Sequence, residues 1–116
     1  MKNKDFSHRL GFALQGIKAS WHSERSFRTQ SLFALLLFPL LIILQPELIW
    51  WAICSLIAAL VLATELINTA LEHLVDHLHP ERHPRIKIVK DCAAGAVLIL
   101  SITALIIAGL MIYSSL

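Results

Sequence analysis

The stretch from Glu47 to Asp76 reads ELIWWAICSLIAALVLATELINTALEHLVD. Residues 48–64 within it contain no Asp, Glu, Lys or Arg. A helix needs about 20 apolar residues to cross the ~30 Å hydrocarbon core of a bilayer. The stretch therefore predicts a membrane-spanning helix over residues 47–67, which continues as a more polar helix to about residue 78.

Two further uncharged stretches lie on either side of this one. Residues 29–46 read TQSLFALLLFPLLIILQP, and no acidic or basic residue follows Asp91 up to residue 116. They predict spans over 29–46 and 92–113. Pro39 lies inside the first of these, where a membrane helix tolerates a proline and bends at it.

The composition of the whole chain agrees with a membrane protein. Among 116 residues, 57% are hydrophobic and 16% are charged, and the mean hydropathy is +0.70. Such values are typical of an all-α membrane protein, here a single domain over residues 1–116 with three transmembrane helices. The net charge of +2 is too small to indicate nucleic-acid binding, and two cysteines without paired Cys/His spacing exclude a zinc module or a disulfide framework.

The basic residues fix an expected orientation. All ten Lys and Arg lie either in residues 1–28 or in residues 82–90. Cytoplasmic segments next to membrane helices carry the excess of Lys and Arg. We therefore expect the N-terminus and a loop over residues 79–90 on the cytoplasmic side, and the C-terminus outside.

Residues 1–28 predict an amphipathic helix that lies on the cytoplasmic membrane surface. Apolar side chains recur there at helical spacing, namely Phe6, Leu10, Ala13, Leu14, Ile17 and Trp21. A surface anchor without any further role explains most of these residues equally well.

Four polar residues at the inner end of the middle span form a stripe. At 100° per residue, Glu65, Asn68, Glu72 and Asp76 fall on one face of a helix. If the hydrocarbon ends near Ile67, then Glu65 and Asn68 lie at its inner boundary. A solvated helix face explains Glu72 or Asp76 taken singly. A carboxylate at membrane depth is costly, however, so Glu65 indicates a functional site.

The residues near this stripe suggest phosphoryl transfer. Carboxylates of this kind hold Mg²⁺, which commonly bridges substrate phosphates. We expect Asp91 to open the third helix, so that free N–H groups there and the Lys90 ammonium face a polyphosphate. Glu65 would take a proton from a lipid hydroxyl. The pattern thus predicts transfer from a metal–nucleotide to a membrane alcohol.

The same residues resemble the prokaryotic diacylglycerol kinase family. Residues 65–76, ELINTALEHLVD, are similar to its E-x-x-N-[ST]-A-[IL]-E-x-x-V-D signature, and residues 90–98, KDCAAGAVL, are similar to its K-D-x-[AG]-[AS]-[AG]-A-V-L run. Residues 16–28, GIKASWHSERSFR, resemble its amphipathic segment. The resemblance covers nearly the whole chain.

This resemblance implies an ATP-dependent lipid kinase of the bacterial inner membrane, a homotrimer with composite active sites at the cytoplasmic surface. It implies that Glu65 is the general base, supported by Asn68, and that Glu24 and Glu72 bind Mg²⁺. The implied nucleotide contacts are Glu24, Glu72, Asp76, Glu81, Arg82, His83, Lys90 and Asp91. The implied contacts to the lipid substrate are Lys18, Trp21, Ser26, Phe27, Arg28, Gln30, Glu65 and Ala94.

The identity of the lipid alcohol stays open. The kinase would convert diacylglycerol to phosphatidic acid, or undecaprenol to undecaprenyl phosphate. Residues 81–84 and 93–97 look more like the undecaprenol kinase branch, although the lipid-facing positions are mostly generic apolar residues.

Two other classes of function are compatible with the spans. A non-enzymatic membrane assembly protein would explain the hydrophobic helices but leaves Glu65 unaccounted for. An ion or proton conductor would use Glu65 as a relay, but the outer halves of the spans have no matching polar series.

Overall fold

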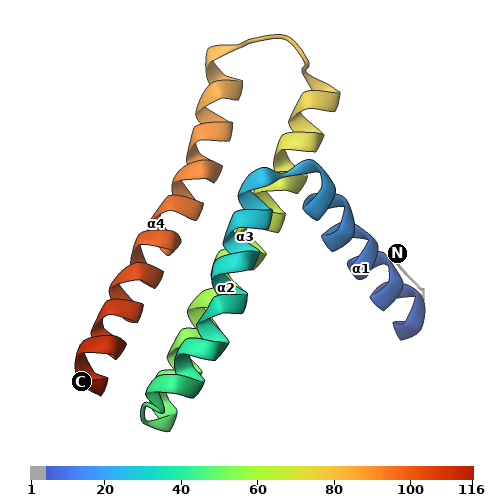
Figure 1. Cartoon of the computed structure of the whole chain (residues 1–116). Coiled ribbons are helices and arrows are strands. Elements are labelled where there is room, and N and C mark those ends of the chain that lie inside the picture. Colours follow the sequence, from blue (N-terminus) through green and yellow to red (C-terminus); the bar gives the residue numbers. More distant parts are fainter. Residues whose placement is uncertain (1–4) are drawn as a thin grey trace.

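The computed structural model describes residues 5–116, and this part of the chain folds into four helices without a strand. They are α1 (Phe6–Ser23), α2 (Arg25–Leu44), α3 (Leu48–Leu78) and α4 (Pro84–Ser115). In Figure 1, α2, α3 and α4 run roughly along one another, whereas α1 projects to one side from the start of α2. Three of the helices, α2, α3 and α4, are long and apolar enough to cross a membrane. The predicted all-helical fold with three spans is confirmed.

The turn between α2 and α3 closes one end of the bundle. Gln45 adopts a left-handed backbone conformation (φ 46°), and its N–H donates to the carbonyl of Leu41 at 2.9 Å. Close to this turn, Leu41, Cys54 and Met111 from three different helices form a buried cluster. All three spans therefore meet at the end of the bundle where the C-terminus also lies (Figure 1).

Helix α3 is the central element, because it packs against both α2 and α4. Its buried residues recur every three or four positions and so form one face, consisting of Cys54, Ile57, Val61, Glu65 and Thr69. Glu65 thus continues an apolar stripe that runs up from the middle of the bundle.

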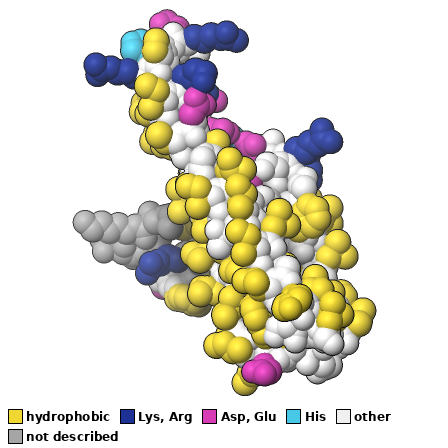
Figure 2. Space-filling model, turned by 90° about the vertical axis from the view of Figure 1, so that its left-hand side faces the viewer, with side chains coloured by type: hydrophobic (Ala, Val, Ile, Leu, Met, Phe, Trp, Pro, Cys, Tyr) yellow, Lys and Arg dark blue, Asp and Glu magenta, His cyan; other side chains and the backbone are white. Residues whose placement is uncertain are grey.

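The outer surface separates into an apolar and a charged part. In Figure 2, hydrophobic side chains cover most of the lower part of the face in view, whereas Lys, Arg, Asp and Glu gather mainly in its upper part. Such a distribution suits a multi-pass membrane protein whose polar end stands in the headgroup layer and the water beyond.

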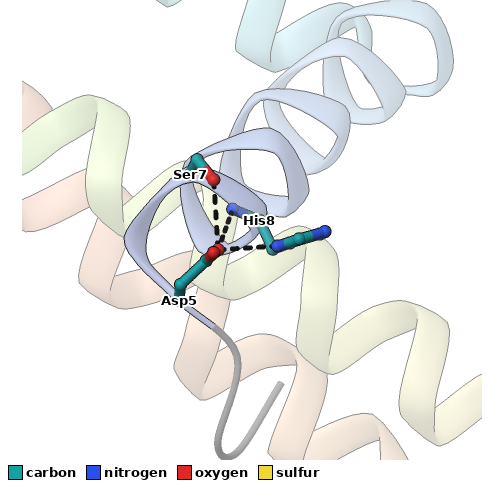
Figure 3. A network of polar contacts seen from close by, with 3 residues as sticks. All are labelled: Asp5, Ser7 and His8. Atoms are coloured by element: carbon teal, nitrogen blue, oxygen red, sulfur yellow. Dashed lines mark hydrogen bonds and ion pairs between the residues drawn. The ribbon is translucent and has the colours of Figure 1, made fainter.

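A side-chain cap starts α1. The Asp5 carboxylate Oδ1 accepts hydrogen bonds from the backbone N–H of His8 at 3.1 Å and from the hydroxyl of Ser7 at 3.1 Å, and it lies 2.6 Å from His8 Nδ1 (Figure 3). Acidic N-caps satisfy N–H groups that have no partner in the first helical turn.

The expected helix over residues 1–28 is divided in the structure. Residues 1–4 lie outside the described part, and α1 ends at Ser23. The backbone of Glu24 is extended (φ −120°, ψ 110°), and residues 25–28 belong to α2. The prediction took the last charged residue before the uncharged run as the helix boundary, whereas the helices in fact meet at Glu24.

The loop before α4 is shorter than the expected 79–90. Helix α4 begins at Pro84, a residue suited to the first helical position, and His83 Nδ1 accepts the backbone N–H of Arg85 at 3.1 Å. The prediction that Asp91 opens this helix is therefore wrong. Asp91 lies two turns inside α4, where the backbone N–H groups are already used by the helix.

Candidate functional site

The Glu65 carboxylate is the most enclosed acidic group of the site, with 2% of the residue exposed. The hydroxyl of Ser26 donates to its Oε1 at 2.6 Å. Among residues 5–116, no Lys, Arg or His lies within ion-pair distance of it. In the described structure, this carboxylate is therefore held by one hydroxyl and is not paired with a cation.

Asn68 stands about 4.5 Å further along α3 than Glu65, at 1.5 Å per residue. Its side chain is half-buried, and its Oδ1 is buried without a hydrogen-bond partner in the described structure. Buried carbonyl oxygens are rarely left without a donor or a cation. This acceptor is therefore available to a ligand atom.

Glu72 and Glu24 are both half-buried and come from different parts of the chain. Glu72 lies on α3, about 10 Å beyond Glu65 along the axis. Glu24 forms the break between α1 and α2, where its backbone N–H donates to the carbonyl of Ser20 at 2.9 Å. The contact of Ser26 with Glu65 brings this junction next to the stripe on α3.

The donor set of this region consists of carboxylate and amide oxygens. Within residues 5–116, no three His, Cys, Asp or Glu side chains are gathered closely enough to hold a metal by themselves. Mg²⁺ is usually held by one or two carboxylates together with substrate phosphates and waters. The oxygen donors and the unpartnered Asn68 Oδ1 fit that mode of binding, and a protein-only metal cage does not.

Two ion pairs organise the adjoining part of α3 and α4. Lys90 Nζ lies 2.5 Å from Asp76 Oδ1 and joins the two helices, and Lys87 Nζ lies 2.6 Å from Asp91 Oδ2 within α4. Asp76, Lys90 and Asp91 are among the residues expected from the sequence to contact the nucleotide, whereas Lys87 is not. Its i, i+4 spacing to Asp91 would have indicated the second pair, had α4 been expected to begin at Pro84.

The loop residues are not brought to the Glu65 end of the stripe. Glu81, Arg82 and His83 are exposed in the segment that joins α3 to α4. His79, at the end of α3, stands roughly 21 Å beyond Glu65 along the helix axis. A ligand would therefore have to extend along α3 and α4 to contact both groups of residues.

Some of the residues assigned to lipid contacts take part in the junction of α1 and α2. Arg28 Nη1 donates to the carbonyl of Trp21 at 2.7 Å and to that of His22 at 3.3 Å, so its guanidinium caps the C-terminal end of α1. Phe27 is 4% exposed and anchors the start of α2, while Lys18 on α1 is exposed.

An apolar groove of about 450 Å³ opens between α2, α3 and α4. Gln30 lies at its lining, and its Nε2 donates to the Ser101 hydroxyl at 2.8 Å. Ser101 was not found by sequence reasoning, because no local pattern pairs it with Gln30. Ala94, also assigned to the lipid, is exposed on α4.

A second groove, of about 430 Å³, lies between α1 and α3. Its polar lining includes Ser20, Thr69 and His73, which the sequence analysis did not select. Thr69 is buried, and its hydroxyl donates to the Glu65 backbone carbonyl at 3.0 Å.

The sequence is similar to those of several known proteins. Residues 11–112 match the family model described as prokaryotic diacylglycerol kinase. The chain is similar to a diacylglycerol kinase of Synechocystis, with 36% identity over 87% of this chain but only 58% of the relative. It is similar to an undecaprenol kinase of Bacillus subtilis, with 34% identity over 95% of this chain and 85% of the relative. It is also similar to a diacylglycerol kinase of Escherichia coli, with 30% identity over 90% of this chain and 85% of the relative.

Proposed function

This chain belongs to the prokaryotic diacylglycerol kinase family, and from that premise we propose that it is a lipid kinase of the bacterial inner membrane. It transfers the γ-phosphate of ATP to the hydroxyl of a membrane lipid alcohol. The observation that carries the proposal is the Glu65 carboxylate, which is enclosed on the packed face of α3 without a cation. The acceptor is diacylglycerol or undecaprenol, since relatives of comparable similarity are named for each.

In this mechanism Glu65 acts as the general base. Its carboxylate takes the proton of the lipid hydroxyl as that oxygen forms a bond to the γ-phosphorus. The bond from the γ-phosphorus to the bridging oxygen breaks, and ADP leaves. Asn68, about one turn from Glu65 on α3, would support the base from the same side of the helix. Catalysis comes mainly from positioning and from neutralisation of charge.

Glu24 and Glu72 would hold Mg²⁺ together with the phosphates of ATP. When bound, the ion supplies positive charge that neutralises the transferred phosphoryl group. The half-buried positions of these two carboxylates, one at the α1–α2 break and one on α3, support this assignment.

The nucleotide would extend from the stripe toward the loop. The Lys90 ammonium would leave its ion pair with Asp76 and pair with a phosphate oxygen, because an ammonium pairs readily with either group. The remaining contacts would come from Glu81, Arg82, His83 and Asp91. The separation of about 21 Å between Glu65 and His79 along α3 supports a composite site, completed in a homotrimer by a neighbouring chain.

The lipid would approach from the side of α1. We place α1 on the cytoplasmic membrane surface as an amphipathic helix, with the C-terminus of the chain outside. Its exposed apolar residues, such as Leu10, Leu14 and Trp21, support this placement. Residues of the lipid approach would be Lys18, Trp21, Phe27, Arg28, Gln30 and Ala94.

The proposed activity is tested with purified protein in mixed micelles and ATP labelled at the γ-phosphate. Transfer of label to diacylglycerol or to undecaprenol, measured side by side, supports the proposal and identifies the better substrate. Absence of transfer to both lipids would contradict it. The protein would then belong with membrane assembly factors or ion conductors. Glu65→Gln is the matched negative control.

A further inference from the structure

We propose that Ser26 is a positioning residue for the base, because its hydroxyl holds the Glu65 carboxylate in the orientation that accepts the lipid proton. This inference rests on the proposed function. The contact itself joins residues 39 positions apart, with Ser26 Oγ donating to Glu65 Oε1 at 2.6 Å. The resemblance placed Ser26 at the lipid approach, but the structure turns its hydroxyl onto the carboxylate.

The position of Ser26 is fixed by the backbone around it. The extended backbone of Glu24 ends α1, so Ser26 falls in the first turn of α2. Phe27, the next residue, is 4% exposed and anchors this turn against the rest of the bundle. This placement brings the Ser26 hydroxyl within hydrogen-bond distance of Glu65 on α3.

A single hydrogen bond matters here because Glu65 has few other partners. Apart from Ser26, no described side chain donates a hydrogen bond to its carboxylate. A glutamate side chain has three rotatable bonds, and the hydrogen bond to Oε1 restricts their rotation. The other carboxylate oxygen, Oε2, is left to accept the proton. The serine hydroxyl keeps its own proton throughout and acts only through Glu65.

The test compares three variants in the mixed-micelle assay. Ser26→Ala removes the donor, and we expect kcat to fall roughly tenfold to hundredfold, as for loss of a hydrogen bond to a charged group, with KM for ATP within twofold. Ser26→Thr keeps the hydroxyl, and the exposed side of the residue accommodates its methyl group, so this variant restores most of kcat. Ser31→Ala removes a hydroxyl further along α2 and leaves the rate unchanged.

Wild-type kcat in Ser26→Ala, or a Ser26→Thr variant as slow as Ser26→Ala, would overturn the inference. A raised KM for ATP without loss of kcat would also contradict it, because a residue that acts through the base changes the chemical step.

A second measurement does not depend on turnover. The infrared difference spectrum of wild type minus Glu65→Gln isolates the carboxylate bands of Glu65. We expect the antisymmetric stretch to shift in Ser26→Ala and to return in Ser26→Thr. Absence of label transfer from the wild-type protein would contradict the proposed kinase function but not the contact between Ser26 and Glu65. Unchanged carboxylate bands of Glu65 in Ser26→Ala would contradict the contact between Ser26 and Glu65 but not the proposed kinase function.

Discussion

Lys90 on α4 and Asp76 on α3 form an ion pair of 2.5 Å that links the two helices near the loop that joins them. Both side chains are substantially exposed, at 36% and 62%. Exposed ion pairs of this kind stabilise a protein by about 1 kcal/mol or less. The pair is therefore too weak to account for the fold, and it leaves the ammonium available for exchange with a phosphate.

Lys90→Ala should impair nucleotide binding more than folding. We expect KM for ATP to rise about tenfold, because a charge-assisted contact to phosphate is lost. The free energy of unfolding should change by less than about 1 kcal/mol. Lys87→Ala, which removes the pair within α4, is the matched control and should leave KM unchanged. Equal effects of the two substitutions on KM would contradict the assignment of Lys90.

Glu65→Gln should abolish turnover while nucleotide binding remains intact and the oligomeric state is unchanged. The amide keeps the shape of the side chain but cannot take a proton, and loss of a general base lowers rates by about 10²–10⁴-fold. Steady-state assays with ATP binding measured separately check this outcome. Glu47→Gln, at an exposed carboxylate before α3, is the control. A normal rate in Glu65→Gln would remove Glu65 from the role of base.

The three spans could be predicted from the sequence because each is an uncharged run of sufficient length. The end of α3 near residue 78 also agrees with the expectation. The starts of α2 and α4 could not be found in the same way. Charged residues such as Asp91 limit the uncharged runs of the sequence, whereas helix ends depend on backbone hydrogen bonds and caps, as at Pro84 and His83.

Only the part of the candidate site that lies on a single helix, α3, could be predicted from the sequence. The 3.6-residue period places Glu65, Asn68 and Glu72 on one side of α3, and the continuous helix there keeps that phase. The contacts of Glu65 with Ser26 and of Gln30 with Ser101 span 39 and 71 residues. Such pairs depend on how α2 packs against α3 and α4, which no local pattern encodes.

The cap of α1 should weaken in acid. The hydrogen bond with the His8 side chain is the main cause that holds the pKa of Asp5 below its ordinary value. The cap is therefore fully present above the ordinary pKa of an aspartate, about 3.9, and is lost as the pH falls through the lower value of the folded protein.

Amide exchange protection in the first turn of α1, followed from about pH 6 downward, measures the weakening of this cap. Asp5→Ala should show low protection at every pH, and Asp5→Asn, which retains a capping oxygen, should show protection that does not vary with acidification. Constant protection in the wild type would show that the Asp5 carboxylate does not hold this helix end.

Glu72→Gln should weaken the dependence of the kinase on magnesium. A neutral amide binds Mg²⁺ less tightly than a carboxylate, so the Mg²⁺ concentration for half-maximal rate should rise about tenfold while the rate at saturating Mg²⁺ falls less. Glu24→Gln should act in the same direction, because both carboxylates would share the ion. Titration of the rate with MgCl₂ at fixed ATP measures the effect, with Glu47→Gln as the control. An unchanged Mg²⁺ titration in both variants would show that these half-buried carboxylates serve the junction of α1, α2 and α3 and hold no metal.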